Sequence, residues 1–126
     1  MKIEHIAIWV KDIDKVCEFY RKYFGGVVQS LYHNPTKQFA SRFVTFEAGT
    51  RLEIMHRPDI ETSDPSEHLG YAHLSFSVGS KEEVDRLTQQ MSNDGIQVVG
   101  EPRTTGDGYY ESVVLDPEGN RVEITI

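Results

Sequence analysis

The sequence has little cysteine and no long apolar run. Its single cysteine, Cys17, excludes an internal disulfide, and the apolar neighbours of Cys17 in a helical pattern predict a buried structural thiol. A membrane-spanning helix needs roughly 20 consecutive apolar residues, which the 126-residue chain does not contain. Residues 1–10 read as a strand and lack the basic, apolar and small-residue regions of a secretory signal. We therefore expect a single globular domain with a cytoplasmic location.

Positive charge is also scarce. The chain has 13 Lys and Arg against 20 Asp and Glu, which gives a formal net charge of -7. Nucleic acids and anionic membranes are bound through basic surfaces, so neither is expected as a partner. The sequence favours a small molecule as the binding partner.

An internal repeat divides the chain into two halves. Residues 5–10 reappear as residues 73–78, and residues 51–54 reappear as residues 121–124. Each half thus opens with a His and closes with a Glu. His5 and Glu53 lie 48 positions apart, and His73 and Glu123 lie 50 positions apart. Two copies of one supersecondary unit are the expected architecture.

The periodicity predicts the elements of each copy. Apolar residues at helical spacing predict one helix over 12–24, ended by Gly25 and Gly26, and a second over 80–94. Three strand-like runs follow each helix: 27–32, 39–47 and 50–56 in the first half, and 96–99, 109–115 and 121–126 in the second. The fold class is therefore α+β, with two βαβββ modules over 1–57 and 70–126 and a linker over 58–69.

The alternation of side chains along the strands sorts the four repeated residues onto one face. His5, Glu53, His73 and Glu123 all lie opposite the apolar face that packs against the helices. For any one of them alone, a solvent-exposed polar position is the simpler interpretation. Their equivalent positions in both halves favour one joint metal centre. Imidazole and carboxylate ligands suit Zn²⁺ or Ni²⁺, and also Co²⁺, Mn²⁺ or Fe²⁺, with positions left for water or substrate.

Several segments resemble the vicinal oxygen chelate superfamily, which comprises the glyoxalase, bleomycin-resistance and extradiol dioxygenase proteins. The segments are Glu4-His5-Ile6-Ala7-Ile8, Phe19-Tyr20 with Gly25, residues 70–78, and Asp116-Pro117-Glu118-Gly119-Asn120 followed by residues 121–124. The resemblance covers essentially the whole chain. It implies a curved, partly open sheet with helices on its convex side, and a homodimer whose sites lie within one chain or across two.

The order His, Glu, His, Glu at the four positions is similar to that of glyoxalase I, a lyase. Glu53 is the most discriminating position, since other branches of the superfamily lack a Glu there. The resemblance implies one divalent ion per site, which acts as a Lewis acid toward an α-oxoaldehyde thiol adduct or a similar α-hydroxycarbonyl and stabilises an enediolate. Glu123 and Glu53 are the catalytic candidates, each as the base that moves the proton.

Two other classes of function stay open. One is a non-catalytic small-molecule binding module, as in bleomycin-resistance relatives. The other is a metal-dependent dioxygenase or thiol transferase.

Three residues are candidates for substrate binding: Trp9, Arg57 and Tyr109. Glutathione-using glyoxalases of this length usually have an arginine at the position of Trp9 and an asparagine at the position of Arg57. Both differ here, so the identity of the thiol stays open. Trp9 shares the face of His5 and offers a stacking surface, and Arg57 offers a charge for a carboxylate. Tyr109 belongs to the stretch 104–110, interpreted either as a loop over the pocket or as an ordinary hairpin connection.

Overall fold

Two compact units make up the chain, Met1–Ser63 and Asp64–Ile126. The computed structural model describes residues 1–47, 49–62, 69–106 and 108–126. The central part of the predicted linker, residues 63–68, lies outside the described residues, as does Asp107 in the stretch 104–110. No described helix combines the length and the apolar character that a membrane span requires.

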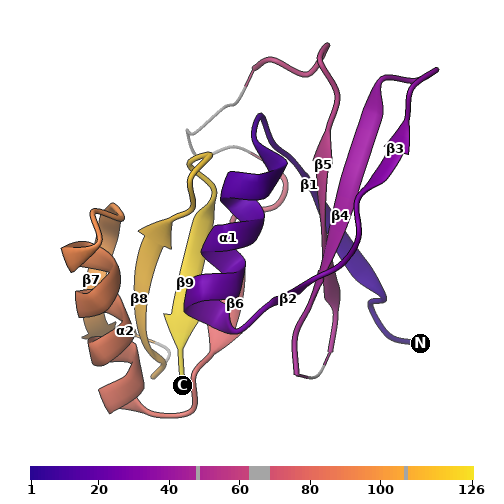
Figure 1. Ribbon diagram of the computed structural model, residues 1–126. Coiled ribbons are helices and arrows are strands. Elements are labelled where there is room, and N and C mark those ends of the chain that lie inside the picture. The colour runs from indigo at the N-terminus through magenta and orange to yellow at the C-terminus, as the bar shows by residue number, and fades with distance from the viewer. Residues whose placement is uncertain (48, 63–68, 107) are drawn as a thin grey trace. The chain divides into compact units, whose positions relative to one another are not determined.

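The first unit is a five-stranded mixed sheet with one helix (Figure 1). Its elements are β1 (His5–Trp9), α1 (Ile13–Phe24), β2 (Val27–Val28), β3 (Tyr32–Asn34), β4 (Phe39–Thr45) and β5 (Arg51–His56). The strand order is β1-β5-β4-β2, with β3 also paired to β4, and β1 runs parallel to β5. The single strand predicted over 27–32 is wrong. The five residues from Val28 to Tyr32 face the four residues from Ser41 to Val44 in β4, so an extra residue interrupts the ladder between β2 and β3.

The second unit repeats this plan with a four-stranded sheet (Figure 1). Its elements are β6 (Leu74–Ser77), α2 (Lys81–Asn93), β7 (Val98–Thr104), β8 (Tyr110–Leu115) and β9 (Arg121–Thr125), in the order β6-β9-β8-β7. β7 continues past the predicted end at residue 99. The stretch 104–110 is consequently a hairpin connection, in which the Thr105 N–H donates to the Tyr109 carbonyl at 2.8 Å.

Each helix begins one residue after its predicted start, because that first residue is the N-cap, whose side-chain oxygen satisfies an unpaired backbone N–H. Asp12 accepts from the Lys15 N–H at 2.9 Å, and Ser80 accepts from the Glu83 N–H at 3.2 Å. Gly25 ends α1 with a φ of 65°, a left-handed conformation that glycine adopts without steric cost.

Each helix covers the apolar face of the sheet in its own unit. In the first unit, Arg42 of β4 donates through Nε to Asp14 of α1 at 3.3 Å, and Ile54, paired with Arg42 across the ladder, is fully buried. In the second, the hydroxyls of Thr88 in α2 and Ser112 in β8 lie 2.6 Å apart, and Ser112 pairs with the fully buried Ile124.

The opposite face of each sheet carries Glu53 in β5 and Glu123 in β9, because consecutive residues of a strand alternate in direction. The predicted fold class is confirmed in both units: each is an open sheet of mixed strands with one helix. Ile126, included in the predicted strand 121–126, follows the last residue of β9 and is 41% exposed.

Candidate metal centre

In the first unit, the sheet brings His5 and Glu53 together. Parallel pairing of β1 with β5 sets His5 opposite Arg51 and Ala7 opposite Glu53, so His5 and Glu53 are diagonal neighbours on one face. The His5 Nε2 atom lies 4.0 Å from the Glu53 Oε2 atom. The imidazole is 43% exposed and the carboxylate only 17%, so the pair lies in the sheet surface with the His toward the outside. We call these two residues the first pair.

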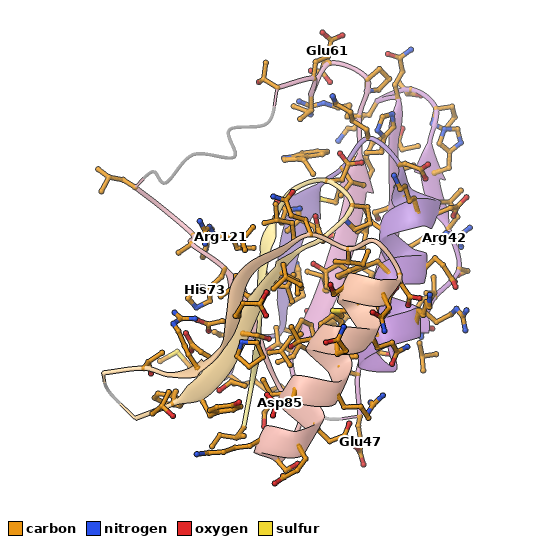
Figure 2. The ribbon with its side chains drawn as sticks, turned by 90° about the vertical axis from the view of Figure 1, so that its left-hand side faces the viewer. Arg42, Glu47, Glu61, His73, Asp85 and Arg121 are labelled. Carbon is orange, nitrogen blue, oxygen red and sulfur yellow. The ribbon has the colours of Figure 1, made fainter. Side chains whose placement is uncertain are left out.

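In the second unit, His73 and Glu123 form the same arrangement. β6 runs parallel to β9 with Ser75 opposite Glu123, so His73, two residues before Ser75, is again the diagonal neighbour of the Glu. The His73 Nε2 atom lies 3.1 Å from the Glu123 Oε2 atom, with exposures of 43% and 16%. Figure 2 labels His73, which immediately precedes β6, and Arg121, the first residue of β9. These two residues are the second pair.

The repeat in the sequence therefore has a geometric counterpart: each unit, taken by itself, presents one imidazole and one carboxylate on its helix-free face. Across residues 1–47, 49–62, 69–106 and 108–126, no group of three or more His, Cys, Asp or Glu side chains has the geometry of a metal site. Each pair alone supplies two ligands, fewer than the three or four that protein metal sites normally contribute. Either pair taken alone is therefore short of a complete ligand set.

A carboxylate outside the predicted set contacts the first pair. Glu4 Oε2 lies 2.5 Å from His5 Nδ1, the ring nitrogen remote from Glu53, and Glu4 also forms an ion pair with Arg51. The hydrogen bond with His5 is the main reason that the pKa of Glu4 is lowered, and Arg51 lowers it further. A carboxylate on Nδ1 is the kind of partner that orients a metal-binding imidazole, with Nε2 as the nitrogen that can bind the ion.

An aromatic side chain completes the surroundings of the first pair. Phe43 of β4 is the cross-strand partner of Glu53 and lies edge-on to the His5 ring, with centroids 5.5 Å apart. The Arg51 guanidinium lies 4.1 Å from the centroid of the same ring. In the second unit, Val113 takes the position opposite Glu123. The first pair therefore has a phenylalanine beside its Glu, where the second pair has a valine.

The sequence interpretation missed Glu4 and Phe43 as site residues. Neighbours on a strand point to opposite faces, so strict alternation argued against a contact between Glu4 and His5. Glu4, however, immediately precedes β1, where the alternation no longer constrains it. Phe43 would have required the register of β4 on β5, which no turn signal in the sequence determines.

Two of the three predicted substrate residues lie together. The Arg57 guanidinium lies 5.3 Å from the centroid of the Trp9 ring, and Trp9 shares its face with His5 on β1. Tyr109 belongs to the second unit, at the hairpin between β7 and β8. It precedes Val113, the partner of Glu123, by four positions, which is about 13 Å along an extended strand. The structure thus brings Trp9 and Arg57 together and leaves Tyr109 distant from Glu123.

Comparison with known proteins identifies relatives of the whole chain. A family model described as the Glyoxalase/Bleomycin resistance protein/Dioxygenase superfamily matches residues 2–124. YqjT of Bacillus subtilis is 26% identical over 97% of this chain and 96% of its own length. The fosfomycin resistance protein FosX of Listeria monocytogenes is 28% identical over 84% of this chain and 75% of its own length.

Solved structures agree on the fold. The trypanothione-dependent glyoxalase I of Leishmania major superposes with a TM-score of 0.80 at 21% identity, covering 99% of this chain and 86% of that protein. At this identity the similarity shows a shared fold.

Proposed function

The chain belongs to the Glyoxalase/Bleomycin resistance protein/Dioxygenase superfamily, and from this membership together with the two His and Glu pairs we propose a metal-dependent lyase or isomerase of glyoxalase I type. The observation that carries the proposal is the equivalence of the pairs. Each unit places a His Nε2 within 4.0 Å of a Glu Oε2 on its helix-free face. The proposed substrate is a small molecule, an α-oxoaldehyde thiol adduct or a similar α-hydroxycarbonyl, and the proposed assembly is a homodimer.

The geometry of the second pair fits a divalent ion. An ion at its usual distance from one imidazole nitrogen and one carboxylate oxygen leaves those two atoms about 3 to 3.5 Å apart at tetrahedral or adjacent octahedral angles. The separation in the second pair, 3.1 Å, lies in this range, and the 4.0 Å of the first pair is wider, so its side chains would have to move closer together around an ion. Two imidazoles and two carboxylates form a donor set for Zn²⁺ or Ni²⁺, with Co²⁺, Mn²⁺ and Fe²⁺ as further candidates. We propose that His5, Glu53, His73 and Glu123 are the ligands of one centre.

The protein groups have separate roles in the proposed reaction. The bound ion would supply Lewis-acid stabilisation of negative charge on two neighbouring substrate oxygens. Glu123 and Glu53 are the proposed bases: one takes the proton from the substrate C–H and returns it to the adjacent carbon. Both carboxylates are mostly buried, with exposures of 16% and 17%, which limits the access of water to the proton in transfer.

Turnover after removal and return of the metal tests this function. The protein is treated with a chelator, dialysed, and reconstituted separately with Zn²⁺, Ni²⁺, Co²⁺, Mn²⁺ or Fe²⁺. Methylglyoxal is then supplied with glutathione, trypanothione or cysteine, and thioester formation is followed by absorbance. We expect turnover only after metal is returned. Equal rates with and without metal, or no turnover with any thiol and any metal, would count against the proposal.

The contact between Glu4 and His5 leads to a second prediction. Glu4→Gln removes the anionic acceptor on His5 Nδ1, so we expect the affinity for the divalent ion to fall by about 10-fold, within the usual range for such outer carboxylates. Calorimetric titration of the metal-free protein with a divalent ion measures this affinity. Glu18→Gln is the matched control, because Glu18 is equally exposed and paired with Arg21 on α1. Equal affinities of the two variants would show that Glu4 does not orient His5.

A second candidate function is metal-dependent thiol transfer, in which a thiol is added to an epoxide. The 28% identity with the fosfomycin resistance protein of Listeria monocytogenes favours it. Consumption of fosfomycin by the metal-reconstituted protein, with and without thiol, distinguishes it from the glyoxalase reaction. Tight binding of a ligand with no turnover of either substrate would instead indicate a non-catalytic binding module.

A further inference from the structure

Three aromatic rings form a continuous row on the helix-free face of the first unit. The centroid of Trp9 in β1 lies 6.1 Å from that of Phe39 in β4, and the Phe39 centroid lies 6.1 Å from that of Tyr32 in β3. Trp9 is 40% exposed and Tyr32 is 56% exposed. Ser41, which pairs with both Tyr32 and Met55 across the ladders, is only 3% exposed, so the row covers the sheet at that point. We call these rings the aromatic row.

The aromatic row borders the first pair. The register pairs Ala7 with Glu53 and Trp9 with Met55. Trp9 therefore lies on the same face as Glu53, two residues further along the neighbouring strand. Two residues along a strand correspond to about 7 Å. A molecule of two linked groups can therefore contact Glu53 with one end and the Trp9 ring with the other, without leaving this unit.

A cation lies at the aromatic row. The Arg57 guanidinium is 5.3 Å from the Trp9 centroid, and its Nε donates to Asp59 at 2.5 Å. Among the residues that the structure describes, the bond to Asp59 involves only the Nε atom of Arg57. The two terminal amino groups of Arg57 can therefore donate to an anionic ligand. Asp59 therefore fixes the direction of the guanidinium, whose fork matches a carboxylate.

From this juxtaposition we propose that the aromatic row and Arg57 form a specificity subsite for a planar aryl group that carries a carboxylate. The aryl ring packs on Trp9 and Phe39, and the carboxylate binds the terminal amino groups of Arg57. Rings favour a flat apolar ligand because stacked and edge-on contacts need a second aromatic surface. The inference rests on the proposed function and names its substrate class: an α-oxo or α-hydroxy carbonyl compound with an aryl carboxylate end.

Binding of phenylglyoxylate tests the subsite. This probe carries an aryl ring and a carboxylate, whereas pyruvate has the same α-oxo acid group without the ring. Kd is measured by calorimetry, and the location is read from the fluorescence of Trp9, the single tryptophan of the chain. We expect phenylglyoxylate to bind at least about 10-fold more tightly than pyruvate and to quench Trp9.

Variants assign the two contacts separately. Phe39→Leu and Arg57→Gln are each expected to raise the Kd for phenylglyoxylate about 5- to 10-fold, the first by loss of the ring contact and the second by loss of the charge. Arg21→Gln, which removes an exposed arginine paired with Glu18 on α1, is the control and should leave Kd unchanged. Circular dichroism confirms that each variant is folded, and Phe39→Tyr, which keeps the ring, should restore binding.

The outcomes separate this inference from the proposed function. Equal affinity for phenylglyoxylate and pyruvate, or unchanged Kd in both Phe39→Leu and Arg57→Gln, overturns the subsite. The titrations are repeated on metal-free protein. Selective binding of the aryl probe by a protein that takes up no divalent ion would support the subsite and overturn the metal-dependent function.

Discussion

Glu53→Gln and Glu123→Gln are each expected to lower the affinity for a divalent ion by more than about 100-fold. An amide keeps the size of the side chain but removes the negative charge that a divalent ion requires from its ligands, and removal of a direct ligand costs more than removal of an outer partner. Because the two residues occupy equivalent positions in the two units, the losses should be similar. Calorimetric titration of the metal-free variants measures both.

Glu111→Gln provides a stringent control for this experiment. Glu111 lies in β8 on the same face as Glu123, and its side chain is 13% exposed, close to the 16% of Glu123. Glu111 is absent from the proposed ligand set. The affinity of the Glu111→Gln variant for the divalent ion should therefore change by less than about threefold. If Glu53→Gln and Glu123→Gln bind the ion as tightly as Glu111→Gln does, the four-ligand centre is wrong.

Ile124→Ala is expected to lower the free energy of unfolding by about 3 kcal/mol. Ile124 of β9 is fully buried on the face that packs against α2. Truncation of its side chain removes contacts and leaves a cavity. Ile54→Ala should have an effect of similar size in the first unit, where Ile54 is also fully buried. Urea unfolding followed by circular dichroism measures the change.

Ile126→Ala is the matched control, since it makes the same substitution two residues further along on a side chain that is 41% exposed. We expect a loss below about 1 kcal/mol there. Ile124 is also the immediate neighbour of Glu123, so the two substitutions should have opposite phenotypes: one weakens the fold, and the other removes metal binding from a stable protein. Equal destabilisation by Ile124→Ala and Ile126→Ala would contradict the burial of Ile124 in the core.

The faces of the strands could be predicted because alternation is a local property. Leu52 and Ile54 are apolar and flank Glu53, and Val122 and Ile124 do the same for Glu123, so the sequence alone separates core from site. The repeat then added that both halves carry the pair. These two signals were sufficient to select His5, Glu53, His73 and Glu123, which the structure places as two equivalent pairs; their union in one centre stays a prediction.

The register between strands could not be predicted from local alternation. β1 pairs in parallel with β5, which lies far along the chain, and no turn connects them to set the alignment. Consequently the position of Phe43 beside Glu53, and that of Phe39 beside Trp9, could not be derived from local patterns. The bulge between Val28 and Tyr32 was missed for the same reason: an inserted residue is visible only against its partner strand.

Composition alone could not distinguish the two interpretations of the stretch that contains Tyr109. The glycines and hydroxyls of the stretch 104–110 fitted a loop over a site as well as a hairpin. The structure shows the hairpin, since β7 extends to Thr104 and the Thr105 N–H bonds to the Tyr109 carbonyl. The role of Tyr109 in substrate binding stays a prediction.

The most direct test of the account is the number of imidazole ligands on the bound ion. Protein loaded with Zn²⁺ is analysed for metal content and by X-ray absorption, which counts the histidine rings around the ion. We predict one ion per chain with two imidazoles and carboxylate oxygens, falling to one imidazole in either His5→Ala or His73→Ala. Two imidazoles in both variants, or no imidazole in the unchanged protein, would contradict a centre built from both pairs.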